Sequence, residues 1–140
     1  MNLKLVTVVI LSALSQVSTC KKDSIDKTYP IEGLWIGTYK YDPVTSPNKE
    51  AQYFSFIIKP GGSLLVESHD DDADYFAKGN WTLTDNTIQF NYVYTSSVFG
   101  VPLSQSASAT FKKSGKLESG KWNNVSNVNE KGTFSMERVD

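Results

Sequence analysis

The densest group of charged side chains is the run SHDDDAD at residues 68–74. Asp70, Asp72 and Asp74 alternate within it, as carboxylates do in loops that bind calcium through oxygen ligands. A calcium loop of the EF-hand type next requires Gly, but Tyr75 stands at that place, and the Glu required further on is also missing. We therefore assign no metal ligand and expect a solvated acidic loop over the whole run, with calcium binding left open.

Few side chains remain for catalysis. The chain holds one His and one Cys, which argues against disulfides, zinc clusters and Cys–His nucleophilic pairs. His69 has no Ser or Cys partner that the sequence identifies, and the glutamates are too scattered to form a glycosidase-like pair. The sequence therefore predicts a protein that is not an enzyme and uses no cofactor.

The single cysteine, Cys20, is better explained by export. It follows Lys4 and an apolar run over residues 5–14 (LVTVVILSAL), a pattern typical of a secretion signal and shorter than the roughly 20 residues of a membrane span. The stretch Val17-Ser18-Thr19-Cys20 resembles the lipobox of bacterial lipoproteins. That resemblance implies removal of residues 1–19 and acylation of Cys20. The alternative is ordinary cleavage that leaves a thiol near the mature N-terminus.

Residues 20–30 (CKKDSIDKTYP) are polar and without periodicity, which is typical of a flexible tether. The start of this segment, Lys21-Lys22-Asp23, resembles the short signals with which some Gram-negative lipoproteins reach the outer face of the cell. We therefore expect an outer-membrane lipoprotein, held to the membrane by its lipid anchor, on either the periplasmic or the cell-surface face.

Residues 31–140 have room for one domain with one modest core. The charges nearly cancel, with 14 Lys+Arg against 15 Asp+Glu. No basic field is therefore available to attract phosphate backbones, and no nucleic-acid partner is expected. Aromatic residues form 12% of the chain, and rings fill a small core efficiently. Composition thus favours an all-β domain.

From residue 31 onward, apolar and polar residues alternate with period two between turn signals. Pro60-Gly61-Gly62 predicts a tight hairpin turn. Eight consecutive antiparallel strands suit an up-and-down barrel, because closure removes the exposed edges of a flat sheet. The expected strands cover residues 33–41, 52–59, 63–67, 75–83, 87–95, 104–112, 116–123 and 131–139.

A motif of glycine, any residue and an aromatic residue recurs along these strands. A glycine two residues before a ring faces the same side of a strand. We therefore expect each ring to cover the gap left by its own glycine. The motif includes every tryptophan and stands at Gly33-Leu34-Trp35, Gly79-Asn80-Trp81, Gly120-Lys121-Trp122 and Gly132-Thr133-Phe134.

The first of these motifs, extended to Gly33-Leu34-Trp35-Ile36-Gly37-Thr38-Tyr39, resembles the first strand of the lipocalin, fatty-acid-binding and avidin group of barrels, the calycins. That resemblance implies that Trp35 plugs one end of the barrel. The chain is shorter than most lipocalins and has no candidate C-terminal helix, which places it nearer to avidin-sized barrels. No biotin-site pattern can be carried over to it.

An eight-stranded barrel is about the size that holds one small ligand or is filled by its own side chains. We expect a small apolar or aromatic ligand at one end, bound by Tyr92, Tyr94, Phe99, Ala107 and Ala109. The alanines lie on the strand beside the rings and permit a cavity. They equally permit a solid core, and a solid barrel would favour a protein partner instead. The expected inward set is Phe54, Phe56, Ile58, Leu83, Ile88, Phe90, Tyr92, Ala107, Ala109, Phe111, Phe134 and Met136.

The lipid anchor leads to a direct prediction for Cys20→Ser. Two or more acyl chains, each contributing about 0.8 kcal/mol per buried CH₂, make a stable anchor, so their loss should move the protein from the membrane fraction to the soluble fraction. Fractionation and mass spectrometry of the mature chain measure this change, while thermal unfolding should stay the same. A variant that remains in the membrane, or a wild-type chain without acyl groups, would show that the prediction is wrong.

Overall fold

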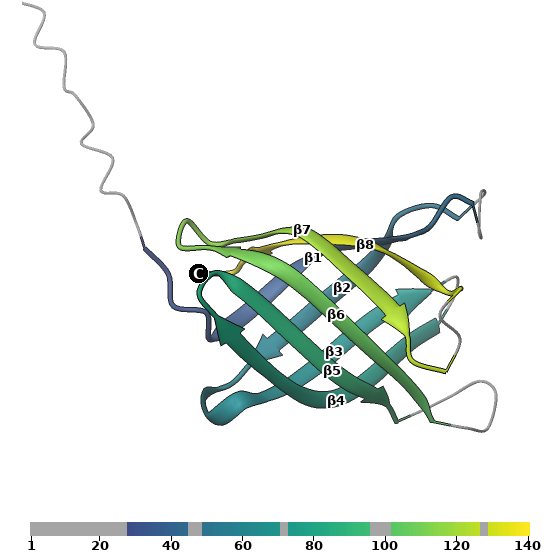
Figure 1. Cartoon of the computed structure of the whole chain (residues 1–140), viewed down its shortest axis with the longest axis horizontal. Coiled ribbons are helices and arrows are strands. Elements are labelled where there is room, and N and C mark those ends of the chain that lie inside the picture. Colours follow the sequence, from purple (N-terminus) through teal and green to yellow (C-terminus); the bar gives the residue numbers. More distant parts are fainter. Residues whose placement is uncertain (1–27, 45–48, 71–72, 96–101, 127–128) are drawn as a thin grey trace, which may run out of the picture.

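The computed structural model describes residues 28–44, 49–70, 73–95, 102–126 and 129–140. Eight strands pair in sequence order, each antiparallel to the next, and β1 also pairs with β8 to close the barrel. The predicted eight-stranded up-and-down barrel is therefore confirmed (Figure 1). The strands are β1 Gly33–Tyr41, β2 Gln52–Ile58, β3 Ser63–Asp70, β4 Ala73–Thr84, β5 Thr87–Tyr94, β6 Leu103–Lys112, β7 Lys116–Asn124 and β8 Lys131–Arg138.

The predicted acidic loop over residues 68–74 is wrong. Strand β3 continues to Asp70 and β4 begins at Ala73, so that Ser68 pairs with Tyr75 and Asp70 with Ala73. The alternation of inward and outward positions continues through these polar residues. Ser68 is buried, and the Asp70 carboxylate is bound by neighbouring side chains. Polar residues with partners can extend a hairpin in place of a loop.

The two ends of the barrel differ. At one end, which we call the closed end, β1 begins, β8 finishes and short turns join β2 to β3, β4 to β5 and β6 to β7. At the other, which we call the loop end, lie the connections β1–β2, β3–β4, β5–β6 and β7–β8 (Figure 1). The N-terminal approach to β1 is therefore at the opposite end from the longer connections.

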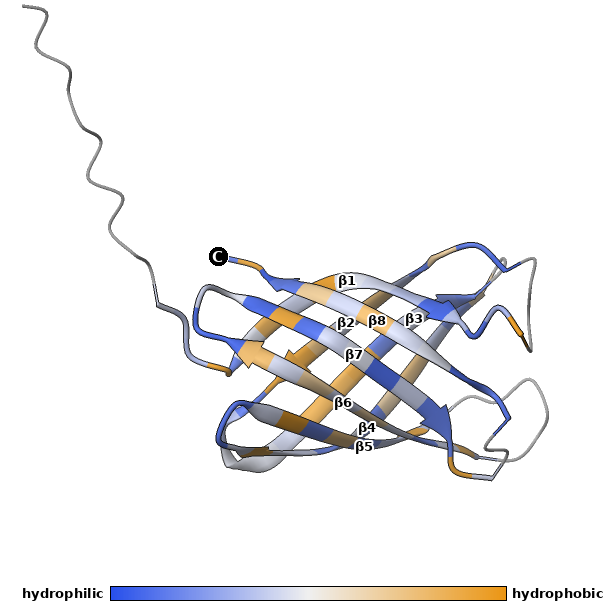
Figure 2. Cartoon of the chain, turned by 45° about the horizontal axis from the view of Figure 1, so that its top comes forward, coloured by the Kyte–Doolittle hydropathy of each residue, from blue (hydrophilic) through white to orange (hydrophobic). Residues whose placement is uncertain are grey.

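Aromatic side chains pack through the middle of the barrel. The ring of Phe56 lies with its centroid 4.6 Å from that of Phe54 and 4.7 Å from that of Phe90. Phe134 lies 5.8 Å from Phe54. The side chains predicted to face inward are buried, except Leu83, which is half-buried against the core. Hydropathy alternates along the strands accordingly (Figure 2).

Trp35 fills the closed end, as its motif predicts. Its side chain is fully buried, its indole N–H donates to the carbonyl of Ile31 at 2.8 Å, and Phe111 meets it edge-on with centroids 6.1 Å apart. Tyr29, which the sequence assigns to the tether, donates its backbone N–H to the carbonyl of Lys113 at 2.8 Å. The chain before β1 is therefore held across this end.

Rings and glycines exchange partners between β7 and β8. A Cβ atom at Gly120 would lie 2.6 Å from the ring of Phe134, and one at Gly132 would lie 2.7 Å from the indole nitrogen of Trp122. Each ring thus covers the glycine of the neighbouring strand, and the expectation that it covers its own is wrong here. The alternation correctly predicted that each glycine and its ring face the same side of the strand. Which ring contacts which glycine depends on the pairing register of the two strands.

A bulge in β7 keeps the strand in phase with the core. Leu117 and Gly120 are both buried, although their odd spacing would place them on opposite faces of a regular strand. The register of β7 against β8 shifts between these two residues, and Ser119 adopts a φ of 55°. The extra residue returns Trp122 to the interior.

The burial of the tryptophans predicts unequal effects of truncation. Trp35→Ala should lower the free energy of unfolding by about 3 to 5 kcal/mol, the range for large aromatic side chains in cores. Trp81 is only half-buried against the core, so Trp81→Ala should cost less and serves as the matched control. Urea unfolding followed by circular dichroism measures both. Equal losses in the two variants would contradict the assignment of Trp35 as the plug.

Candidate functional site

The two alanines of the predicted site lie among large buried side chains. Ala107 pairs with Phe90 on β5 and with Trp122 on β7, and all three side chains are buried. Ala109 pairs with Ile88, which is fully buried. Large side chains therefore stand beside both alanines, in the alternation of small and large residues that fills small barrels.

The two tyrosines of the predicted site lie elsewhere, in a layer of rings at the loop end. Tyr92 and Tyr94 occupy successive inward-facing positions of β5, and their ring centroids are 5.8 Å apart. Tyr39 and Tyr41 do the same on β1, at 5.7 Å, and Trp122 meets them edge-on at 5.8 Å and 5.1 Å. We call these five side chains the ring layer. Phe99 and Cys20 lie outside the described residues.

The hydroxyl groups of the ring layer bind polar groups of β3. Tyr39 donates to the carbonyl of His69 at 3.1 Å, and Tyr41 donates to the carboxylate of Asp70 at 2.8 Å. The hydroxyls of Tyr94 and Ser68 share a hydrogen bond of 2.9 Å. These hydrogen bonds join β1 and β5 to β3, although neither strand pairs with β3 in the sheet.

A second set of hydrogen bonds continues from Tyr92 to the rim. The Tyr92 hydroxyl donates to Gln105 Oε1 at 2.9 Å, and Gln105 Nε2 donates to Asn124 Oδ1 at 2.6 Å. Asn124 Nδ2 donates to the carboxylate of Glu130. Asn124 is only 2% exposed, whereas Glu130 is exposed. These hydrogen bonds therefore connect the buried Tyr92 on β5, across β6 and β7, to a carboxylate in solvent.

Asp70 also binds a cation at the rim. The Lys49 ammonium donates to Asp70 Oδ1 at 2.7 Å and lies 4.9 Å from the centre of the Tyr41 ring. Asp74 is 2.8 Å from His69 Nδ1. Within the described residues, no three His, Cys, Asp or Glu side chains are grouped to hold a metal ion. Asp72, which the calcium interpretation also needs, lies outside them.

Burial favours the neutral phenol at Tyr41, Tyr92 and Tyr94. It raises the pKa of Tyr94 to about 12, a rise that the Ser68 hydrogen bond reduces and nearby Asp70 increases. Burial also raises the pKa of Tyr92 well above its ordinary value, and burial together with the Asp70 hydrogen bond raises that of Tyr41. These hydroxyls therefore act as hydrogen-bond donors at neutral pH. The arrangement is suited to binding and offers no activated nucleophile.

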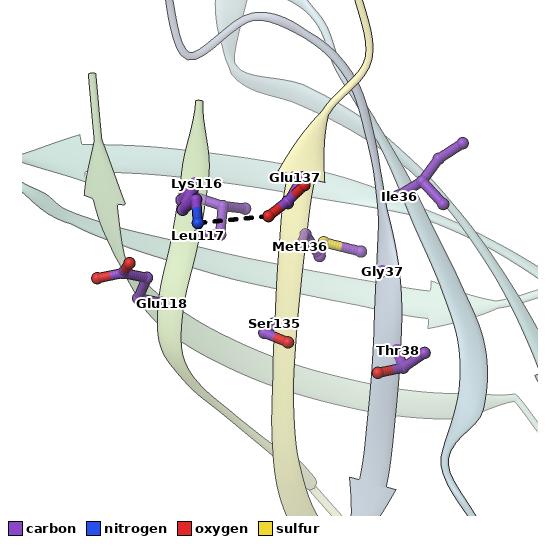
Figure 3. A pocket seen from close by; sticks show the side chains of 9 residues that line it. All are labelled: Ile36, Gly37, Thr38, Lys116, Leu117, Glu118, Ser135, Met136 and Glu137. Carbon is purple, nitrogen blue, oxygen red and sulfur yellow. Dashed lines mark ion pairs between the residues drawn. The ribbon is translucent and has the colours of Figure 1, made fainter. Parts of the chain in front are cut away.

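Two hollows lined by described residues lie on the outer wall. One, of about 480 Å³, runs along β8 between Ile36 and Glu118, beside the Lys116–Glu137 ion pair of 3.5 Å (Figure 3). The other, of about 400 Å³, lies over β6 and is lined by polar side chains that include Asn91. Neither hollow is predicted from the sequence, because each depends on the relative placement of three strands.

Comparisons of the chain with protein-family models, with curated proteins and with solved structures found no match. Among the helices within the described residues, none is long and apolar enough to span a bilayer.

Part of the ring layer was not predicted from the sequence. Tyr39 and Tyr41 could have been found, because the period-two alternation that places Trp35 inside also places them inside. The chain through Gln105 and Asn124 had no such signal, since amides at these positions are equally typical of an outward face. Only the register of β6 against β7 brings the two amides together.

The raised pKa of Tyr94 predicts a loss of stability in alkali. The unfolded chain, with a tyrosine pKa of about 10, loses the proton first, so the contribution of the neutral phenol is complete below that pH and is lost as the pH approaches 12. Between these pH values, the free energy of unfolding of Tyr94→Phe should fall less than that of wild type, each compared with its own value at neutral pH. The difference is up to about 1.4 kcal/mol per pH unit. Urea unfolding along a pH series measures this. Parallel pH profiles for the two proteins would contradict it.

Proposed function

We propose that this chain is an exported, membrane-anchored binding protein that holds a small aromatic or apolar molecule against the ring layer at the loop end. The observation that carries the proposal is the presence of two groups of buried or half-buried rings at that end: Tyr39, Tyr41 and Trp122 contact one another, and Tyr92 contacts Tyr94. Aromatic faces and edges supply contact area, and the adjoining hydroxyls and carboxylates supply orientation.

Packing supports binding at the loop end over binding deep in the barrel. A ligand beside Ala107 would have to displace Phe90 or Trp122, both of which are buried. A ligand at the rim meets Tyr41 and Tyr75, which are only half-buried and lie against the buried rings beneath. Rim side chains can rearrange at lower cost, because fewer neighbours are close-packed against them.

The position of the N-terminus supports a ligand that comes from the aqueous phase. Tyr29 lies at the closed end, where it contacts Lys113 and Arg138. An anchor at Cys20 would therefore reach the barrel from the end opposite the ring layer. In that arrangement the anchor joins the barrel at the end away from the ring layer and leaves the loop end accessible to soluble molecules.

A protein-facing role is the second candidate, favoured by the filled interior. Phe54, Phe56, Phe90 and Phe134 form a continuous series of ring contacts. A barrel filled in this way does not need a ligand for its stability. Under this alternative, the rim would bind the side chains of another protein.

Titration with 2-phenylethanol and with the dye 8-anilinonaphthalene-1-sulfonate, followed by tryptophan or dye fluorescence, tests the proposal. We expect saturable binding that Tyr41→Ala weakens about tenfold, as loss of roughly 1.4 kcal/mol of contact energy would. Tyr53→Ala removes a ring from the outer wall, where Tyr53 is 38% exposed, and is the matched control. Thermal unfolding should show that both variants fold.

Ala109→Phe separates the rim from the interior. If the probe binds at the ring layer, a thermally stable Ala109→Phe variant keeps its affinity, whereas a deep site would be blocked. Absence of saturable binding by either probe, or equal affinities of wild type and Tyr41→Ala, would contradict the proposal. The second of these results would direct attention to the outer wall or to a protein partner.

A further inference from the structure

The outer wall of the barrel has an apolar side and a polar side. Among the described strands, every large hydrophobic residue that is substantially exposed belongs to β1–β5 and none to β6–β8. On β6 the outward positions are Ser104, Ser106, Ser108 and Thr110. Single exposed hydrophobic residues are ordinary on proteins, but a contiguous group on one side indicates an interaction surface.

The strand register makes part of this group continuous. Leu34 pairs with Ile57, and Ile57 pairs with Leu65, so that three outward side chains form a row across β1, β2 and β3. Their exposed fractions are 37%, 42% and 40%. Ile36 adjoins the row on β1, and Phe76 on β4 is 53% exposed. We call these five side chains the apolar wall.

Two charged residues lie within the apolar wall in a self-complementary arrangement. Leu65 pairs with Lys78, and Glu67 pairs with Phe76. The four side chains therefore form a rectangle with the hydrophobic residues on one diagonal and the opposite charges on the other. Among the described ion pairs, none joins Glu67 to Lys78.

We propose that the part of the apolar wall around Leu65 and Phe76 binds the same surface of a second copy of this chain. A two-fold axis in the interface, along the diagonal through Leu65 and Phe76, would lay each of these residues against its own counterpart. The same axis brings Glu67 of one copy near Lys78 of the other, twice. A symmetric interface requires a patch of this self-complementary kind, and sheets pack face to face in such crossed orientations.

The charges favour a second copy over a lipid surface. Glu67 is half-buried and accepts a hydrogen bond from Ser55 at 3.4 Å. Placing this carboxylate against hydrocarbon without a cation would cost desolvation energy that no lipid group returns. In the two-fold arrangement, Lys78 of the other copy supplies the cation. The barrel has no free sheet edge, so association has to use side chains.

Sedimentation of the purified Cys20→Ser chain over a range of concentrations tests the proposal without interference from an anchor. We expect a reversible dimer that Leu65→Lys converts to monomer with little change in the thermal midpoint, since Leu65 is exposed. Ser108→Lys, on the polar side, is the matched control and should remain dimeric. A wild-type chain that stays monomeric throughout, or a Leu65→Lys variant that dimerises like wild type, would overturn the proposal.

A charge exchange tests the axis itself. Glu67→Lys and Lys78→Glu should each weaken dimerisation tenfold or more through like-charge contacts, and the double variant should restore it. Failure of the double variant to recover, with all three proteins folded, would overturn this geometry. Binding of wild type to vesicles of neutral and anionic lipid, lost in Leu65→Lys while the protein is monomeric in solution, would assign the wall to a lipid surface instead.

Discussion

Pairing of β1 with β8 turns the sheet into a closed surface with a fixed interior. Every second residue of every strand then points into the same narrow space, and the side chains there have to fit one another across the barrel. The exchange between β7 and β8 is one result, because Phe134 and Trp122 fit only where Gly120 and Gly132 leave room. The bulge at Ser119 is another, since it brings the strand back into phase with this interior.

The same constraint shapes the loop end. Tyrosines on β1 and β5 extend the ring packing to the rim, but each brings a hydroxyl that needs a partner where water is excluded. Ser68, Asp70 and Gln105 provide these partners. Within the described residues, no buried side-chain nitrogen or oxygen lacks a hydrogen bond. The candidate binding surface is thus the part of the aromatic core that lies at the loop end, next to solvent.

The alternation of apolar and polar residues was sufficient to predict the number and order of the strands and most of the inward side chains, because alternation is a local property of the chain. The prediction failed at residues 68–74, where the composition is typical of a loop but the alternation continues into Asp70. Whether the space beside Ala107 is open could not be predicted either. The answer depends on Phe90 and Trp122, which lie on the two strands that flank β6 and pair with Ala107. Tyr41 and Lys49 meet Asp70 because β1 and β3 both flank β2.

The attachment of the N-terminal segment has a mechanical consequence. Arg138 at the end of β8 donates to the carbonyl of Glu32 at 3.1 Å, and its guanidinium lies 5.2 Å from the centre of the Tyr29 ring. A pull on the chain ahead of Tyr29 is therefore shared with β8 and with the β6–β7 turn before it reaches the hydrogen bonds of β1. Tension would load the barrel across several strands in shear, instead of peeling its first strand away one residue at a time.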